Sequence, residues 1–168
     1  MSKSKTTQVS TFKNKQPAIC IKVQREDFNL QQEYLQVLNN EAVSGAVVTF
    51  TGLVRDTNDG HKVTGLALEH YPGMTEKSLL QIAEQACERW SLEAITVIHR
   101  VGKLSLGDQI VLVAVASKHR GDAFSACEFM MDFLKTKAPF WKKETTEDGD
   151  IWVEAKSSDE EKAGSWEL

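Results

Sequence analysis

The chain has 168 residues, of which 41% are hydrophobic and 26% charged, and this composition is ordinary for a globular protein of one domain. Its formal net charge of −4 argues against a general nucleic-acid-binding protein. No apolar run approaches the roughly 20 residues of a membrane span, and residues 1–16 lack the apolar segment of a secretory signal.

The first half of the chain predicts a strand, a helix and a β-hairpin. Residues 1–17 are polar and are expected to form a disordered tail. Alternating and β-branched residues predict strands over 18–24 and 46–54, and helical spacing of apolar residues predicts a helix over 29–42. The Asp59-Gly60 pair favours a hairpin turn, from which a strand returns over 62–70.

The second half predicts two helices, two strands and a final hairpin. The helices cover 75–90, with Thr75 as its cap, and 122–135; the strands cover 94–101 and 109–116; the hairpin pairs 140–145 with 151–155. The continuous apolar run 110–116 indicates a strand buried on both faces. Residues 157–168 are charged or small and are expected to form a disordered tail, which leaves 18–156 as a single domain.

Hairpins and helices without strict β-α-β alternation predict an α+β fold with a mixed or antiparallel sheet and packed helices. The three cysteines, Cys20, Cys87 and Cys127, are widely spaced within apolar patterns. We therefore expect free buried thiols in a cytoplasmic protein, and no metal site.

Lysines gather around Pro139, between the predicted helix 122–135 and the strand 140–145. Pro139 ends the helix and holds Lys135 and Lys142 near large apolar groups. Loss of solvation there would lower a lysine pKa and suit the side chain to proton transfer at neutral pH. The alternative is that these lysines are solvated residues that complement the dipole at a helix carboxyl terminus.

Two further positions carry candidate binding residues. His119 and Arg120 lie where a buried strand ends and a helix begins, which favours an anion site, although a solvated loop capped by Asp122 is the alternative. Arg55 ends a strand, where an arginine is more often solvated than functional. Met131 lies one helical turn before Lys135, so Met131 and Phe50 are candidates for the wall of a pocket, or for plain core packing.

Five segments in order resemble one known family, the large, catalytic subunit of molybdopterin synthase (MoaE). They are VTFTGLVR at 48–55, LEHYPGM at 68–74, VIHRVG at 97–102, SKHR at 117–120 and LKTKAPFWKKE at 134–144. The resemblance covers about residues 45–155 and implies an α+β fold with a hammerhead-like β subdomain. It also implies a homodimer that carries one small partner at each outer end, a heterotetramer.

The reaction implied by the resemblance converts cyclic pyranopterin monophosphate into molybdopterin, in molybdenum cofactor biosynthesis, by installing two sulfurs. The sulfur comes from a thiocarboxylate on the C-terminal Gly-Gly of a small ubiquitin-like partner, and the step uses no metal or cofactor. The chemistry needs a cationic clamp for the phosphate, a proton donor and acceptor, and a groove for an extended tail.

Carried over by position, the resemblance makes Lys135 the principal catalytic lysine and Lys142 the second. The substrate-binding residues that it implies are Arg55, His119, Arg120, Met131, Phe50 and Lys156. Lys156 stands where relatives can carry an arginine; it keeps the charge and loses the bidentate fork.

Helix geometry separates Arg120 from Lys135 by about 22 Å, so either one of them lies outside the site or two chains share the site. The dimer that the resemblance implies favours the shared site. Two other functions stay open: a non-catalytic docking module for a ubiquitin-like protein, and a Schiff-base lysine enzyme of other specificity.

Overall fold

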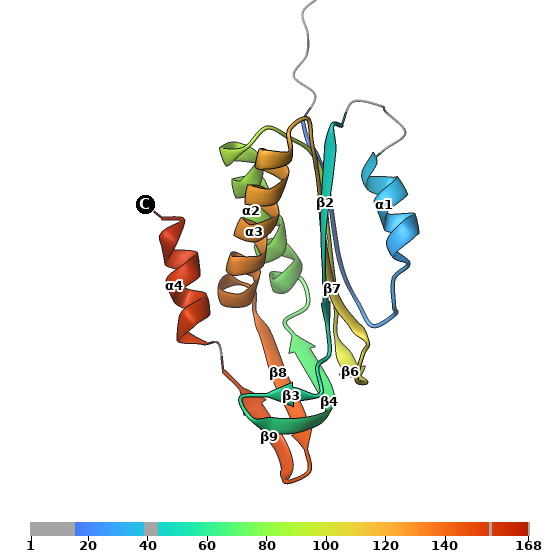
Figure 1. Ribbon diagram of the computed structural model, residues 1–168, viewed down its shortest axis with the longest axis vertical. Helices are drawn as coiled ribbons and strands as arrows, with labels where there is room; N and C mark the ends of the chain where they lie inside the picture. Colours follow the sequence, from blue (N-terminus) through green and yellow to red (C-terminus); the bar gives the residue numbers. More distant parts are fainter. Residues whose placement is uncertain (1–15, 39–43, 155, 168) are drawn as a thin grey trace, which may run out of the picture.

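The computed structural model describes residues 16–38, 44–154 and 156–167, which form a mixed sheet, an antiparallel sheet and the helices α1 to α4 (Figure 1). Most of the tail predicted over 1–17 and the end of the helix predicted over 29–42 lie outside these residues.

The mixed sheet has the strand order β1-β5-β7-β2. β1 (Ala18–Gln24) pairs in parallel with β5 (Leu92–Arg100). β5 is antiparallel to β7 (Gln109–Ser117), which is antiparallel to β2 (Ala46–Leu53). All four strands were predicted, because each combines β-branched residues with an apolar pattern.

Helices cover both faces of this sheet (Figure 1). α2 (Met74–Arg89) and α3 (Arg120–Lys137) pack on one face around the main core, and α1 (Leu30–Leu38) lies on the other. Because β7 is central and covered on both sides, its residues from Val111 to Ser117 are buried, as the apolar run predicted. No helix in the described part of the chain is long and apolar enough to cross a membrane.

The antiparallel sheet lies beyond one end of the mixed sheet (Figure 1). Its order is β3 (Thr57–Asn58), β4 (His61–His70), β8 (Phe140–Thr146) and β9 (Gly149–Val153), and β6 (Gly102–Leu104) pairs with β4. The short strands β3 and β6 were not predicted. This sheet is the β subdomain that the resemblance implied, so the α+β fold with mixed and antiparallel sheets is confirmed.

The predicted turn at Asp59-Gly60 forms, but its hairpin joins β4 to the short β3 and not to β2, which pairs with β7 instead. Asp59 and Gly60 both have positive φ angles, 47° and 84°, which a two-residue hairpin turn of this hand requires. The tight turn fixes Asn58, the residue before it, at a position where it is 9% exposed.

Neither Thr75 nor Asp122, the two residues named above as helix caps, caps its helix. Thr75 lies inside the first turn of α2, where its hydroxyl accepts a hydrogen bond from the Tyr71 N–H and donates one to the Pro139 carbonyl, each 3.1 Å long. Thr75 therefore ties the start of α2 to the turn after α3. α3 begins at Arg120 rather than at Asp122, and His119 is its capping residue.

The disordered tail predicted over 157–168 is wrong for residues 157–165, which form α4 (Ser157–Ser165) against α3. Ala163 is 4% exposed, and the Trp166 ring contacts Trp90 and Phe129 edge-on, with ring centroids 5.6 Å apart in both pairs. The Trp166 indole N–H also donates to Asp132 Oδ2 at 2.9 Å. These few contacts hold α4 against the rest of the protein. The helix was not predicted because its sequence is rich in charged residues.

The cysteines are free thiols, as expected. Cys127 is buried, and Cys20 and Cys87 are half-buried. Burial raises the pKa of both Cys87 and Cys127 to about 11, so these two thiols are protonated at neutral pH and are poor nucleophiles.

Candidate active site

A cavity of about 450 Å³ lies where the carboxyl end of α3 meets the antiparallel sheet. Four of the predicted site residues line it, all of them cations: Arg55, Lys135, Lys142 and Lys156. They come from the segment after β2, the last turn of α3, strand β8 and the segment before α4. The fold thus collects positive charges that are as much as a hundred residues apart in sequence.

The turn at Pro139 brings the two lysines to one cavity. Ala138 has extended backbone angles, φ −83° and ψ 132°, as a residue before proline prefers. The chain therefore passes from α3 into β8 within two residues, and Lys135 and Lys142 both line the cavity.

The two lysines are less desolvated than the sequence suggested. The Lys135 side chain is 52% exposed, and its ammonium lies 3.6 Å from Asp159 Oδ1 on α4. The Lys142 side chain is 36% exposed, and its ammonium lies 3.0 Å from Glu144 Oε1. Each lysine therefore lies beside a carboxylate, while apolar side chains such as Leu134 and Phe140 also line the cavity, as expected.

Glu144 is a buried carboxylate with a side chain only 8% exposed. It accepts two hydrogen bonds from Asn58 Nδ2, of 2.9 and 3.1 Å, in addition to its contact with Lys142. The Asn58 carbonyl oxygen faces the other way and accepts from Arg55 Nη2 at 3.5 Å and from Lys156 Nζ at 3.4 Å. One buried amide therefore connects the surroundings of three of the four cations.

Lys156 also anchors the hairpin turn, because its ammonium donates to Asp59 Oδ1 at 2.8 Å. This hydrogen bond and charge hold the pKa of Asp59 below its usual range. Lys156, at a position where relatives can carry an arginine, thus contacts two consecutive residues of the turn, Asn58 and Asp59.

His99 closes one side of the cavity. Its ring stacks on Phe140 with centroids 3.8 Å apart, and Nδ1 lies 2.9 Å from the Arg100 carbonyl, to which it donates as the neutral tautomer. Burial lowers the pKa of His99 to about 4. His99 is therefore a neutral ring in the wall at physiological pH.

The other four predicted site residues do not line this cavity within one chain. His119 and Arg120 begin α3, at the end of the helix far from Lys135. Phe50 lies on β2 and is 41% exposed, and the half-buried Met131 packs against the main core. In a single chain, the predicted site is therefore divided between the two ends of α3.

A larger cavity, of about 740 Å³, has a lining that includes Lys143, Lys103 and Arg25. Lys143 is the neighbour of Lys142 on β8, so the two side chains leave opposite faces of the strand. Lys143 pairs with Asp150 at 3.1 Å. None of the predicted site residues lines this cavity, so its volume does not make it the better candidate.

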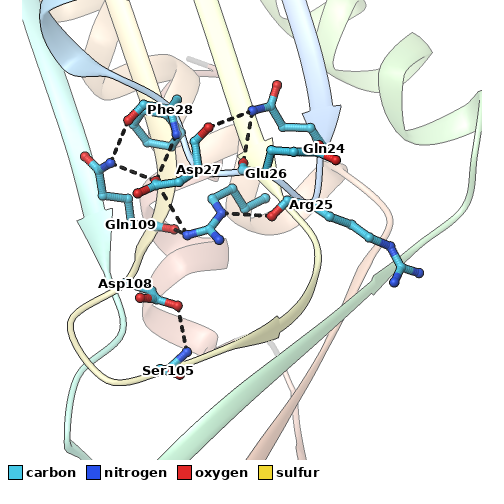
Figure 2. A network of polar contacts seen from close by, with 9 residues as sticks. Gln24, Arg25, Glu26, Asp27, Phe28, Ser105, Asp108 and Gln109 are labelled. Atoms are coloured by element: carbon cyan, nitrogen blue, oxygen red, sulfur yellow. Dashed lines mark hydrogen bonds and ion pairs between the residues drawn. The ribbon is translucent and has the colours of Figure 1, made fainter.

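Figure 2 shows how the connection from β1 to α1 is fixed beside this second cavity. Gln109 Nε2 donates hydrogen bonds of 2.9 Å to Asp27 Oδ1 and to the Phe28 carbonyl. The bond from Gln109 is the main cause that lowers the pKa of Asp27. The Arg25 side chain points away from this network (Figure 2), and neither Asp27 nor Gln109 lines the second cavity.

The polar residues of the candidate site that sequence reasoning missed include Asn58, Glu144, Glu154, Asp159 and, as a wall residue, His99. Glu144 follows Lys142 by two positions on a strand, and this period places both on one face, so the signal was present. Asn58 contacts Glu144 across 86 positions of sequence, a pairing that no local pattern indicates.

The chain is similar in sequence to known proteins of one family. The family model described as MoaE protein matches residues 23–137. The molybdopterin synthase catalytic subunit of Vibrio cholerae is 57% identical over 147 residues, which cover 88% of this chain and 97% of that protein.

Solved structures agree with the sequence matches. The MoaE protein of Burkholderia ambifaria superposes with a TM-score of 0.76 at 48% identity, covering 89% of this chain and 99% of that one. Molybdopterin synthase from Staphylococcus aureus superposes with a TM-score of 0.71 at 38% identity, covering 83% and 98%. From the family model, the identity and the shared fold, the chain belongs to the MoaE family.

Proposed function

We propose that this protein is the catalytic subunit of a molybdopterin synthase. It transfers sulfur from the C-terminal thiocarboxylate of a small ubiquitin-like partner to cyclic pyranopterin monophosphate. The observation that carries the proposal is the convergence of Arg55, Lys135, Lys142 and Lys156 on one cavity in a MoaE-family chain. A docking module needs a groove and has no use for four converging cations.

The cavity matches the chemistry that the reaction requires. The substrate carries a cyclic phosphate, and guanidinium and ammonium groups are the side chains that bind phosphate best. An ammonium beside the partner's terminal carbonyl stabilises negative charge that develops on its oxygen, and it also supplies a proton. We assign Lys135 as the principal catalytic lysine and Lys142 as the second, with Arg55 and Lys156 as substrate-binding residues.

The His119-Arg120 end of α3 completes the site from a second copy of the chain. A two-fold axis between two copies brings the amino end of one α3 near the carboxyl end of the other and produces two equivalent sites. Phe50 on β2 and Met131 on α3 belong to the substrate pocket in this dimer. We expect the dimer to carry two partner molecules and to act in the cytoplasm.

The test is reconstitution of the reaction from purified components. The chain is incubated with the thiocarboxylated partner and cyclic pyranopterin monophosphate, and the dithiolene product is measured. We expect product in proportion to the thiocarboxylate consumed. Tight binding of the partner without product would instead identify a docking module, and a lysine adduct trapped by borohydride with carbonyl substrates would identify a Schiff-base enzyme.

A further inference from the structure

A buried pair, Asn58 and Glu144, lies between the proposed catalytic and substrate-binding cations. Both residues are almost excluded from solvent, at 9% and 6% exposed, and neither is among the site residues that the resemblance implied. We propose that Asn58 and Glu144 are positioning residues: Glu144 sets the location of the Lys142 ammonium, and Asn58 holds Glu144 while orienting Arg55 and Lys156. This inference rests on the proposed function for the role of Lys142.

The polarity of the Asn58 amide is what suits it to this position. Its NH₂ group faces a carboxylate and donates to both Glu144 oxygens, at 2.9 and 3.1 Å. Its carbonyl oxygen faces two cations and accepts from Arg55 and Lys156. An aspartate of the same shape would place a second negative charge against Glu144, and an apolar residue would leave a buried carboxylate without two of its hydrogen bonds.

The fold holds both members of the pair rigidly. Asn58 precedes the Asp59-Gly60 turn and pairs with His61 across the hairpin. Glu144 lies in the middle of β8, paired on one side with Leu66 of β4 and on the other with Ile151 of β9. A carboxylate on a central strand has little freedom to follow a moving ammonium, so its position determines where Lys142 sits.

Lys142 is the residue that benefits from a fixed partner. Its side chain is 36% exposed and has several rotatable bonds, so on its own it would sample many positions. The Glu144 contact of 3.0 Å selects one of them. A misplacement of about 1 Å in a reacting group costs on the order of 100-fold in rate, so loss of this contact has a catalytic consequence without unfolding the protein.

The variants Asn58→Asp, Glu144→Gln and their combination test the proposal, with Thr57→Ala as the control on the same short strand. In the double variant, the new amide at position 144 donates to the new carboxylate at position 58, and its carbonyl faces Lys142. The order of donors and acceptors is thereby restored. Measured quantities are kcat, the KM for the pterin, the partner Kd and the Tm of the full chain.

We expect each single variant to lower kcat by about 10- to 100-fold while the partner Kd stays within about threefold of wild type. The double variant should recover at least a tenth of wild-type kcat, and Thr57→Ala should retain wild-type kcat. If Asn58→Asp fails to fold, Glu144→Gln decides alone, because it keeps the shape and an acceptor for Asn58. A folded Glu144→Gln chain with kcat within about threefold of Thr57→Ala overturns the proposal.

Chemical labelling separates this inference from the proposed function. Limited acetylation followed by mass spectrometry reports the reactivity of Lys142, with Lys143 on the other face of β8 as an internal standard. Glu144→Gln should change the ratio of Lys142 to Lys143 labelling at least threefold, whether or not sulfur transfer is observed. An inactive wild-type chain would contradict the proposed function, whereas an unchanged labelling ratio would contradict the positioning role.

Discussion

Complementation between two inactive variants tests the shared site, because the structure leaves the predicted residues at opposite ends of α3. Arg120 and Lys135 are fifteen residues apart on one helix, which corresponds to about 22 Å at 1.5 Å per residue. The cavity beside Lys135 has a volume of about 450 Å³ and would measure only roughly 10 Å across as a sphere. One small pterin therefore cannot contact both residues of the same chain.

The perturbation is a mixture of Arg120→Ala and Lys135→Ala chains, refolded together or co-expressed. Random pairing makes half of the dimers mixed, and each mixed dimer has one intact site and one site that lacks both side chains. Sulfur transfer should therefore return to about a quarter of wild-type activity, although each parent is inactive. The assay is molybdopterin formation, and native mass spectrometry establishes the fraction of mixed dimers.

A second mixture supplies the matched control. Lys135→Ala and Lys142→Ala remove residues of the same cavity, so a mixed dimer of these two chains has no intact site. We expect no recovery from this pair. If the Arg120→Ala and Lys135→Ala mixture contains mixed dimers and remains at the parental level, the shared-site reasoning is refuted.

Individual contacts give three further predictions. Lys135→Ala should lower turnover by about 10²–10⁴-fold. Lys137→Ala, which changes an exposed lysine two positions further on, should leave turnover unchanged. A folded Lys135→Ala chain with more than about a tenth of wild-type turnover would exclude the catalytic role. The pKa of His99 is lowered from 6.5 to about 4, so the contribution of the neutral ring to folding stability is fully present above pH 6.5. This contribution falls by about 3 kcal/mol as the pH drops to 4. His99→Phe should remove this part of the pH dependence of Tm, and an unchanged dependence would contradict the assignment. Trp166→Ala should destabilise the chain by about 2–3 kcal/mol in urea unfolding, because the half-buried ring anchors α4; a change below about 0.5 kcal/mol would mean that α4 contributes little.

The sequence predicted most of the fold because its signals are local. The strand β7 is visible as a run of apolar residues, and the turn before β4 is visible as Asp59-Gly60. α4 was missed because its burial depends on Ala163 and Trp166 against α2 and α3, while every other position of the helix is charged, small or polar. Composition alone describes such a segment as a tail.

Most of the predicted site residues that line the cavity belong to segments that resemble the family. Arg55, Lys135 and Lys142 belong to segments that resemble the family, and the structure gathers them with Lys156 at one cavity. Asn58 belongs to a turn whose residues are selected for backbone geometry, so nothing local indicates the positioning role that we propose for it. Its contact with Glu144 exists only once the two strands pair through β4, and this is a property of the tertiary structure.

The central claim is that sulfur transfer takes place at the cavity lined by Lys135 and Lys142, and a cross-link locates the partner's terminal carbonyl directly. Activation of the partner's C-terminal carboxylate in the complex allows a nearby amine to displace the activating group and form an isopeptide bond. Mass spectrometry then identifies the lysine. We expect Lys135 or Lys142 in the wild-type complex, and a cross-link found only at Lys103, Lys143 or Lys162 would contradict the account.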